Sequence, residues 1–390
     1  MRSIDAAQRR NRAAVRHRLA PASRTDDATA IAEAVVALHA TDPATVFLSV
    51  TARSRDLEPA HVEKALYEDR TLLRLLAMRR TMFVAPVDLL PALQAGVADA
   101  LAVKQRRTYG KYLEGVVEGD IASWLAEVEE ETRRELLARG SATGAQLGAA
   151  VPRLRTQVDT APGKSYSKPT NITTWVLVTL GCAGHIVRGR PGGSWTSSRY
   201  SWAPTESWLP AGVPAMAAGE ARTELARRWL YAFGPAPVAD LKWWTGWSLA
   251  EVRKALAPLD IAEVDLDGAT GIALAGDLDP VPAPDPWAAL LPALDPTPMG
   301  WQSRDWFLGP HGPALFDRNG NIGPTVWWDG RIVGGWAQRP DGEIAWRLLE
   351  DVGNDARALI ESEAERVRGW FGDVRAIPRF RTPLERELSA

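Results

Sequence analysis

Residues 238–274, VADLKWWTGWSLAEVRKALAPLDIAEVDLDGATGIAL, contain the pattern that decides the fold. The run Val238–Trp244 has the length and composition of a short helix. Thr245-Gly246 then provides a turn, since glycine adopts the left-handed conformation at no steric cost. Ser248 with a glutamate three residues later forms a capping box, which predicts a second helix ending near Leu256.

A hairpin is predicted directly after these two helices. The segments 261–266 and 272–274 are rich in β-branched and apolar residues, and Asp267-Gly268 between them is a typical hairpin turn. Two helices joined by a glycine turn and followed by a hairpin is the order of a winged helix-turn-helix unit. The sequence therefore predicts one such unit here, preceded by a helix over 221–231.

The same order of elements occurs twice more, earlier in the chain. In the first copy, helices start after Asp26 or Asp27, at Asp42-Pro43 and at Pro59, where an acidic cap or a first-turn proline is typical. Its hairpin strands are predicted at 72–76 and 81–84. The second copy has the same kinds of signal, namely a helix over 121–138, a capping box at Thr143 and Gln146, and a third helix that is capped by Asn171 and runs to Leu180. Extended segments follow around 185–188 and 199–202.

The C-terminal third is predicted to be rich in strands. Prolines are dense over 276–298, which excludes a continuous helix or central strand there. The turns Asp329-Gly330 and Asp341-Gly342 separate three apolar segments, and a helix over 355–370 follows. We predict an α+β protein with three tandem winged-helix units around a C-terminal β-barrel-like region. The predicted parts are residues 1–120 with a basic N-terminal arm, 121–215, 216–278, and 279–390 with the proline-rich connection.

Composition and charge narrow the possible functions. The 390 residues include one cysteine and five histidines, so neither an internal disulfide nor a zinc finger is expected, and no cofactor is implied. No apolar run approaches the roughly 18 residues of a membrane helix, and no secretory signal is visible, which predicts a cytoplasmic protein. The net charge of −2 is uneven, because residues 1–254 carry +8 and the rest −10. Such asymmetry favours a polyanion-binding face in the first 254 residues.

Three segments resemble one known family. They are His39-Ala40-Thr41-Asp42-Pro43 with Leu48-Ser49 and Ala52-Arg53, the segment Leu75–Thr81, and Gly323-Pro324-Thr325-Val326 with Asp329-Gly330-Arg331 and Gly335-Trp336. In order and spacing these resemble the AlkZ/YcaQ-like winged-helix DNA glycosylases, with coverage of about residues 5 to 370. The resemblance implies duplex DNA as the partner, including alkylated or crosslinked DNA.

The resemblance also implies a catalytic position. The family's Gln-x-Gln or Gln-x-Asp triplet corresponds to His39-Ala40-Thr41, where both side chains differ from the family pattern. An N7-alkylated purine is cationic and leaves readily, so the enzyme needs to hold a water and stabilise an oxocarbenium-like sugar. His39 and Thr41 are therefore the predicted catalytic residues, because each can orient that water. Asp42 either supplies a negative charge that stabilises the oxocarbenium-like sugar or caps the helix that follows it.

Eight basic residues are predicted to contact DNA. They lie on the two predicted hairpins and on a basic run that follows the first of them: Arg74, Arg79, Arg80, Lys104, Arg106, Arg107, Arg188 and Arg190. Such residues neutralise phosphates without reading sequence. The alternative is that these residues lie on a solvent-exposed turn or helix face and do not contact DNA. The seven lysines include no evident Schiff-base nucleophile, so the predicted enzyme is a monofunctional glycosylase.

Two functions remain open from the sequence. The first is a DNA N-glycosylase that acts on bulky or crosslinking alkylated purines. The second is a noncatalytic DNA-binding protein, either a transcriptional regulator or a damage sensor. A winged-helix repressor usually dimerises on a palindromic site, and this chain has no heptad pattern or separate dimerisation helix, so a monomer is predicted.

Overall fold

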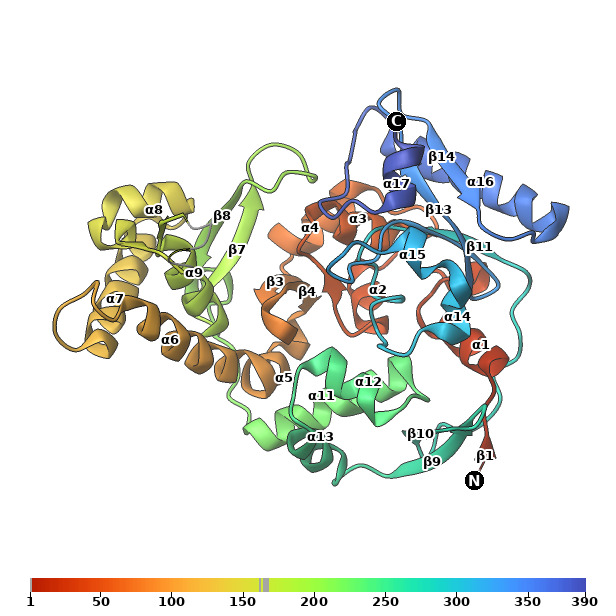
Figure 1. Ribbon diagram of the computed structural model, residues 1–390, viewed down its shortest axis with the longest axis horizontal. Coiled ribbons are helices and arrows are strands. Elements are labelled where there is room, and N and C mark those ends of the chain that lie inside the picture. The colour runs from red at the N-terminus through yellow and green to blue at the C-terminus, as the bar shows by residue number, and fades with distance from the viewer. Residues whose placement is uncertain (1, 161–162, 164–167) are drawn as a thin grey trace. The chain divides into compact units, whose positions relative to one another are not determined.

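The computed structural model describes residues 2–160, 163 and 168–390 (Figure 1). The chain folds into two compact units. Unit 1 consists of Met1–Leu72, Phe83–Pro86 and Thr223–Ala390, and unit 2 consists of Leu73–Met82 and Val87–Arg222. The four-part division made from the sequence stays a prediction.

The first part of unit 1 contains the three short helices that the sequence predicts. They are α2 (Ala28–Ala34), α3 (Pro43–Thr51) and α4 (Pro59–Tyr67). Asp27 and Asp42 cap α2 and α3 by accepting backbone N–H groups of the first turn. Strand β2 (Leu38–His39) precedes α3 and pairs antiparallel with β4 (Met82–Pro86), so that Leu38 faces Val84 and His39 faces Phe83.

Another group of elements in unit 1 confirms the helices and hairpin predicted from residues 238–274. It contains α11 (Ala218–Phe233, whose first residues belong to unit 2), α12 (Val238–Thr245), α13 (Leu249–Leu256), β9 (Ile261–Leu266) and β10 (Ala269–Leu274). Gly246 ends α12 in the left-handed conformation with φ 75°, and Ser248 and Glu251 form the predicted capping box. The N-terminal β1 (Arg2–Ser3) adds to β9 in parallel, and α1 (Ala6–Arg16) follows it. The basic N-terminal segment is therefore largely a helix.

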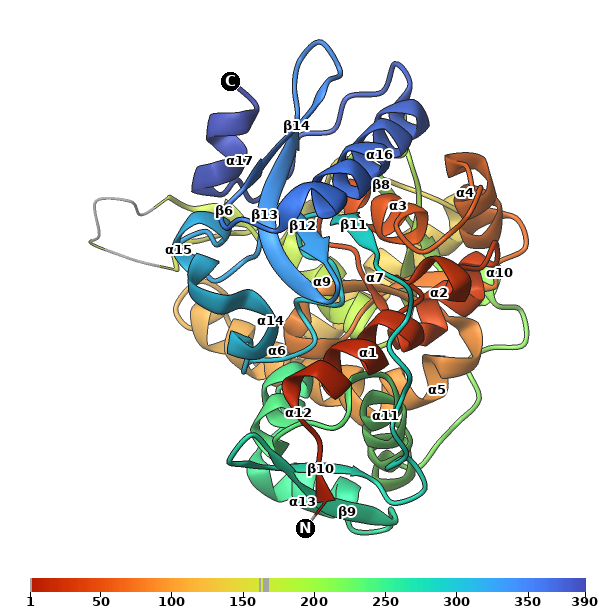
Figure 2. The ribbon, with the colours of Figure 1, turned by 90° about the vertical axis from the view of Figure 1, so that its right-hand side faces the viewer.

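The C-terminal strands form an open sheet. Their order is β11 (Ala288–Leu291), β12 (Thr325–Trp328), β13 (Arg331–Gln338) and β14 (Ile344–Leu348), all antiparallel. Helix α16 (Gly353–Phe371) packs on β11 and β14, and α17 (Pro383–Leu388) packs on β13 (Figure 2). Among the described strands β11 and β14 remain edges, so the prediction of a barrel-like region is corrected to an open four-stranded sheet.

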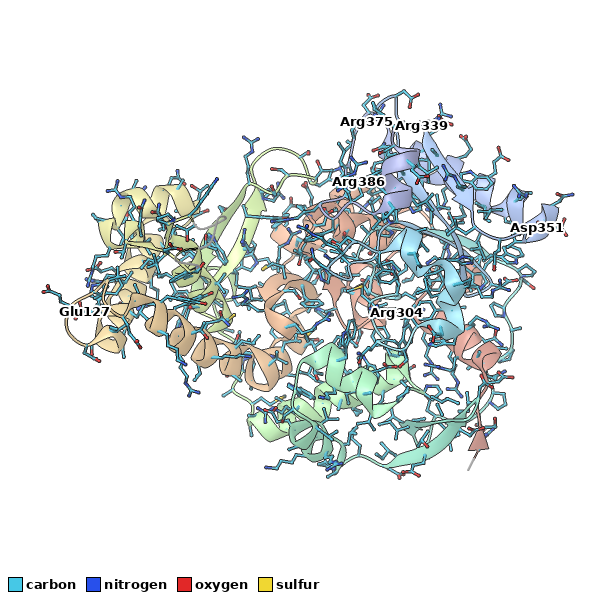
Figure 3. The ribbon with its side chains drawn as sticks, in the orientation of Figure 1. Glu127, Arg304, Arg339, Asp351, Arg375 and Arg386 are labelled. Atoms are coloured by element: carbon cyan, nitrogen blue, oxygen red, sulfur yellow. The ribbon has the colours of Figure 1, made fainter. Side chains whose placement is uncertain are left out.

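Two arginines hold the turn between β13 and β14 (Figure 3). Arg339 donates to Glu343 at 2.6 Å, and Arg375 donates to the Pro340 carbonyl at 3.1 Å. The short helices α14 (Asp305–Leu308) and α15 (Gly312–Leu315) lie between β11 and β12 in the sequence. The contacts of Arg339 and Arg375 attach the C-terminal segments to the sheet.

Unit 2 is mainly helical and contains the hairpin formed by β7 (Ile186–Pro191) and β8 (Tyr200–Pro204). Its elements are the part of β3 (Leu72–Leu76) that follows Leu72, then α5 (Leu90–Leu93), α6 (Asp99–Leu113), α7 (Ile121–Arg139), α8 (Gly144–Ala150), β5 (Gln157–Val158), β6 (Thr170–Asn171), α9 (Thr173–Cys182), β7, β8 and α10 (Thr205–Trp208). The capping box at Thr143 and Gln146 is confirmed. The expected cap of α9 is wrong, because Ile172, and not Asn171, occupies the N-cap position.

The core of unit 2 lies among α6, α7, α8, α9 and the hairpin. Leu113, Val128 and Leu177 are buried in it, as is Trp202 on β8. Strands β7 and β8 pair antiparallel, with Val187 opposite Ala203. The hairpin is thus anchored at its base by apolar side chains.

Candidate functional site

His39 and Thr41 lie in unit 1, where β2 leads into α3. His39 is 6% exposed, and its ring packs edge to face on Phe83 of the neighbouring strand at 5.2 Å between ring centres. The backbone N–H of Thr41 donates to His39 Nδ1 over a long 3.5 Å. In a neutral imidazole this assigns the ring proton to Nε2. The pairing with β4 and the contact with Phe83 hold the imidazole in one orientation.

Asp42 acts as a structural cap. One carboxylate oxygen accepts the Ala44 N–H at 3.1 Å, and the other accepts the Arg379 N–H at 2.8 Å. Burial raises the pKa of Asp42, which is 5% exposed, and the two backbone donors partly oppose that rise. Of the two roles left open by the sequence, the structure confirms the helix cap.

Thr41 has an unsatisfied hydroxyl group. Its Oγ1 is buried and has no hydrogen-bond partner among the residues that the structure describes. A buried hydroxyl in a native protein nearly always bonds to protein or water, because losing both partners costs about 1–3 kcal/mol. The Thr41 hydroxyl therefore keeps its capacity to form a hydrogen bond with a water molecule or a ligand.

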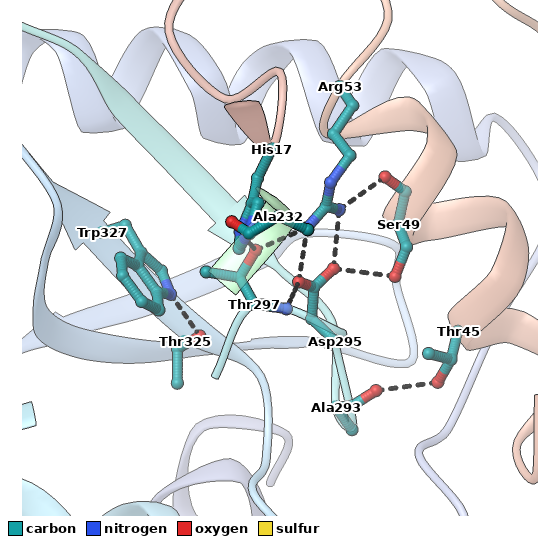
Figure 4. Close-up of polar contacts among 10 residues, drawn as sticks. All are labelled: His17, Thr45, Ser49, Arg53, Ala232, Ala293, Asp295, Thr297, Thr325 and Trp327. Carbon is teal, nitrogen blue, oxygen red and sulfur yellow. Dashed lines mark hydrogen bonds and ion pairs between the residues drawn. The ribbon is translucent and has the colours of Figure 1, made fainter. Parts of the chain in front are cut away.

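A buried ion pair fixes the C-terminal end of α3 (Figure 4). Arg53, just after the helix, donates two hydrogen bonds to Asp295 at 2.7 and 2.8 Å, and both side chains are fully buried. Ser49 on the same helix donates to Asp295 at 2.7 Å. Because Thr45 also donates to the Ala293 carbonyl at 2.8 Å, two successive turns of α3 and the residue just beyond the helix end are bonded to the segment 293–295.

His17 completes this network. Arg53 donates to the Thr297 hydroxyl at 2.8 Å, and Thr297 then lies 2.9 Å from His17 Nδ1. His17 Nε2 lies 3.0 Å from the Ala232 carbonyl, which can only accept, so Nε2 carries the proton. Burial lowers the pKa of His17 to about 3, and a neutral ring is what this chain of bonds requires. His17 is therefore structural, and it keeps α3, and hence Thr41, in place.

The first three predicted DNA contacts lie on strand β3 and the turn after it. Arg74 is only 2% exposed and donates to the Tyr200 hydroxyl. Arg79 and Arg80 are the central residues of a tight turn in which Thr81 N–H donates to the Met78 carbonyl at 3.1 Å. Both have positive φ, 53° and 61°, where Asn and Gly are usual.

The remaining predicted contacts lie on α6 and β7 of unit 2. Lys104, Arg107 and Arg190 are exposed. Arg106 forms an ion pair with Glu129 at 2.7 Å, which raises the pKa of Arg106. Arg188 is half-buried against Trp202, with its guanidinium carbon 4.2 Å from the ring centre. Contact of these residues with DNA stays a prediction.

No group of three or more His, Cys, Asp or Glu side chains is arranged to hold a metal ion in the described part of the chain. In the same residues, no helix is long and apolar enough to span a membrane. Sequence reasoning also missed three members of the network behind α3, namely His17, Asp295 and Thr297. Arg53 was visible in the Ala52-Arg53 segment, but its partner is more than 240 residues away.

The arrangement around α3 thus combines an oriented histidine, an unsatisfied threonine hydroxyl and a rigidly attached helix. The chain belongs to the family described as DNA glycosylase AlkZ-like, whose model matches residues 32–370. Membership places it among DNA-repair glycosylases, which act on DNA.

A known structure with this fold is that of another DNA glycosylase. The DNA glycosylase AlkZ of Streptomyces sahachiroi matches with a TM-score of 0.76 and 20% sequence identity, over 96% of this chain and 98% of that one. A search of curated proteins gives no match. The mixed α+β fold predicted from the sequence is therefore confirmed.

Proposed function

We propose that this protein is a monofunctional DNA N-glycosylase that hydrolyses the glycosidic bond of alkylated purines. The observation that carries the proposal is the buried, unsatisfied hydroxyl of Thr41, a residue whose backbone N–H contacts the His39 ring, at the position that the resemblance assigns to the family's catalytic triplet. An unsatisfied hydroxyl group at that position is available to form a hydrogen bond with a water molecule.

The reaction does not require a strong general base from His39 or Thr41. In an N7-alkylated purine the base is cationic, so the bond from C1′ to N9 breaks with its electron pair going to the base, which leaves neutral. The water oxygen then bonds to C1′ and a proton is released. Thr41 accepts a hydrogen bond from the water and His39 orients it, so that it faces the oxocarbenium-like sugar without a strong general base.

We extend the proposal to bulky and crosslinking adducts. A winged helix binds a duplex through its grooves and backbone, so a lesion attacked there need not fit a deep base-flipping pocket. The three helix-and-hairpin groups are the proposed winged helices, and the exposed cations Lys104, Arg107 and Arg190 are proposed phosphate contacts.

The test measures release of N7-alkylguanine from alkylated duplex DNA by wild type, Thr41→Val and His39→Ala. Thr41→Val keeps the side-chain shape and removes only the hydroxyl, and we expect it to lower the rate by about 10²-fold. Thr29→Val is the matched control, since it removes a threonine hydroxyl from the exposed start of α2. Circular dichroism checks that each variant is folded.

The outcomes separate the proposal from its alternative. Both side chains of the triplet differ from the family's Gln-x-Gln or Gln-x-Asp, which favours a noncatalytic DNA binder as the second candidate. If wild type binds duplex DNA but releases no base above background, the regulator or damage sensor is the better interpretation. If wild type is active and His39→Ala keeps the full rate, the role of His39 is wrong.

A further inference from the structure

The segment that joins α16 to α17 contacts the start of α3 in unit 1. Residues 375–381, with the sequence RAIPRFR, are termed the C-terminal strap. The Arg379 N–H donates at 2.8 Å to Asp42, which caps α3 and directly follows Thr41. The strap therefore lies next to the loop that contains the predicted catalytic residues.

Hydrogen bonds hold the backbone of the strap in one conformation. Gln338 on β13 accepts the Ala376 N–H at 2.9 Å and donates to the Val374 carbonyl at 3.0 Å. Arg375, which is labelled in Figure 3, donates to four backbone carbonyls at 2.9 to 3.1 Å, those of Pro340, Asp341, Gly372 and Val374. A segment fixed in this way loses little further backbone entropy when its outward side chains bind a partner.

The strap contains three arginines, and the chain uses the side chains of two of them. Arg375 donates to the four carbonyls, and Arg381 forms an ion pair with Glu385 at 2.6 Å. Arg379 is exposed, and its guanidinium group forms no hydrogen bond or ion pair with any residue that the structure describes. Its guanidinium carbon lies 5.9 Å from the Phe380 ring centre, at the limit of a cation–π contact. The Arg379 cation is therefore available to an external anion.

The strap also exposes an apolar side chain close to Arg379. Ile377 is 71% exposed, more than any other large hydrophobic side chain in the described part of the chain. Ala376 and Pro378, on either side of it, line a small cavity together with Asp42, so Ile377 points away from α3. A single exposed isoleucine is ordinary on a protein surface, but this one lies two residues from an unpaired cation on a fixed segment. The DNA backbone matches this pair, because it offers a charged phosphate next to the less polar face of a sugar.

We propose that the C-terminal strap binds the DNA strand beside the damaged nucleotide, with Arg379 on one phosphodiester group and Ile377 against the neighbouring sugar. The inference rests on the proposed function, in that it takes DNA as the partner and Thr41 as the reacting position. Arg379 can donate two parallel N–H bonds to the phosphate oxygens, which fixes the position of the strand without reading its sequence. Because the backbone of Arg379 is bonded to Asp42, a phosphate held there keeps the glycosidic bond near the Thr41 hydroxyl. Arg379 is thus a positioning residue.

The first measurement is the affinity of the full-length protein for an undamaged duplex as a function of salt concentration. Each phosphate contact contributes about 0.9 to the slope of log K against log salt. Arg379→Met should lower that slope by about one and weaken binding roughly tenfold at low salt. Arg379→Lys should keep the slope, because it keeps the charge. Ile377→Ala should weaken binding a few-fold with the slope unchanged, since it removes apolar surface and no charge.

The matched control is Arg357→Met, which removes one exposed cation from α16. Phe371 at the end of this helix lines the same cavity as Asp42 and Pro378, and Arg357 lies about four helical turns, or roughly 21 Å, before Phe371. The salt slope of Arg357→Met should equal that of wild type.

The second measurement locates the phosphate relative to the reacting position. The probe is a duplex with one tetrahydrofuran abasic site, a stable analogue of the product, in which one phosphate at a time is replaced by an uncharged methylphosphonate. For wild type, one replacement within about two nucleotides of the abasic site should weaken binding roughly tenfold. The same replacement should have little effect on Arg379→Met, because that variant has already lost the contact.

Three results would overturn the inference in whole or in part. An unchanged salt slope in Arg379→Met would overturn the phosphate site, and an unchanged affinity in Ile377→Ala would remove the sugar contact. A methylphosphonate effect that is equal in wild type and Arg379→Met at every position would overturn the location beside the lesion.

The failure of this inference can be distinguished from the failure of the proposed function, because neither measurement requires release of a base. If wild type releases no base while Arg379→Met lowers the salt slope, the proposed function fails and the phosphate contact stands. Normal base release by wild type together with an unchanged slope in Arg379→Met would overturn the strap and leave the proposed function standing.

Discussion

Acidification should destabilise unit 1 through His17, the histidine buried behind α3. Burial lowers the pKa of His17 to about 3 from its ordinary 6.5, whereas the unfolded chain binds a proton below pH 6.5. The folded-state pKa is depressed, so the stabilisation is fully present above pH 6.5 and is lost as the pH falls from 6.5 toward 3. Between pH 7 and pH 5 this loss amounts to about 2 kcal/mol.

The assay compares wild type with His17→Gln by urea unfolding at pH 7 and pH 5. Glutamine can donate to the Ala232 carbonyl and accept from Thr297, but it has no titrating group, so the other groups continue to titrate in both proteins. From pH 7 to pH 5 the free energy of unfolding should fall by about 2 kcal/mol more in wild type than in the variant. Equal losses in the two proteins would refute the interpretation of His17 as a buried neutral ring.

Two further predictions concern the packing of unit 1. Arg53→Met leaves the fully buried Asp295 carboxylate without its cation and should lower the free energy of unfolding by about 3–5 kcal/mol. The double variant Arg53→Met/Asp295→Leu should lose less, and a double variant as unstable as the sum of the two single variants would contradict this coupling. Gly334→Ala on β13 places a methyl group against the Arg347 carbonyl and should lower the free energy of unfolding by at least about 1–3 kcal/mol. Gly369→Ala in α16 adds a methyl group that meets no neighbouring atom and should raise it by about 0.5–1 kcal/mol. Urea midpoints check both, and a change of the same sign in the two variants would be inconsistent with the packing.

Local signals in the sequence located most elements. Asp42 before Pro43 predicts the start of α3, and the capping boxes at Thr143 and Ser248 predict the starts of α8 and α13, because each involves only residues within one helical turn. Tight-turn dipeptides likewise separated β12, β13 and β14. Strand β11 was not predicted, since its residues 288–291 lie among prolines and it is defined only by its pairing with β12.

The candidate site was predictable in part. The position of His39 and Thr41 followed from the family resemblance, and the cap at Asp42 followed from its place before a proline. The sequence predicted neither the burial of the Thr41 hydroxyl nor the contact of His39 with Phe83. Burial depends on the folded chain, and the contact depends on strand β4, some forty residues later.

The sequence by itself determined the kinds and order of the elements, the uneven charge and the family, because these depend on residues close together in the chain or on short motifs. Only the tertiary structure decided which charges are paired. It joined Arg53 to Asp295 and His17 to Thr297, each across more than 240 residues, and it placed the Arg74 guanidinium on the Tyr200 ring. It also left the C-terminal sheet open, because β11 and β14 are held by helix α16 rather than by each other. Burial and long-range pairing set the energy of a charge or a strand edge, and neither is encoded in local spacing.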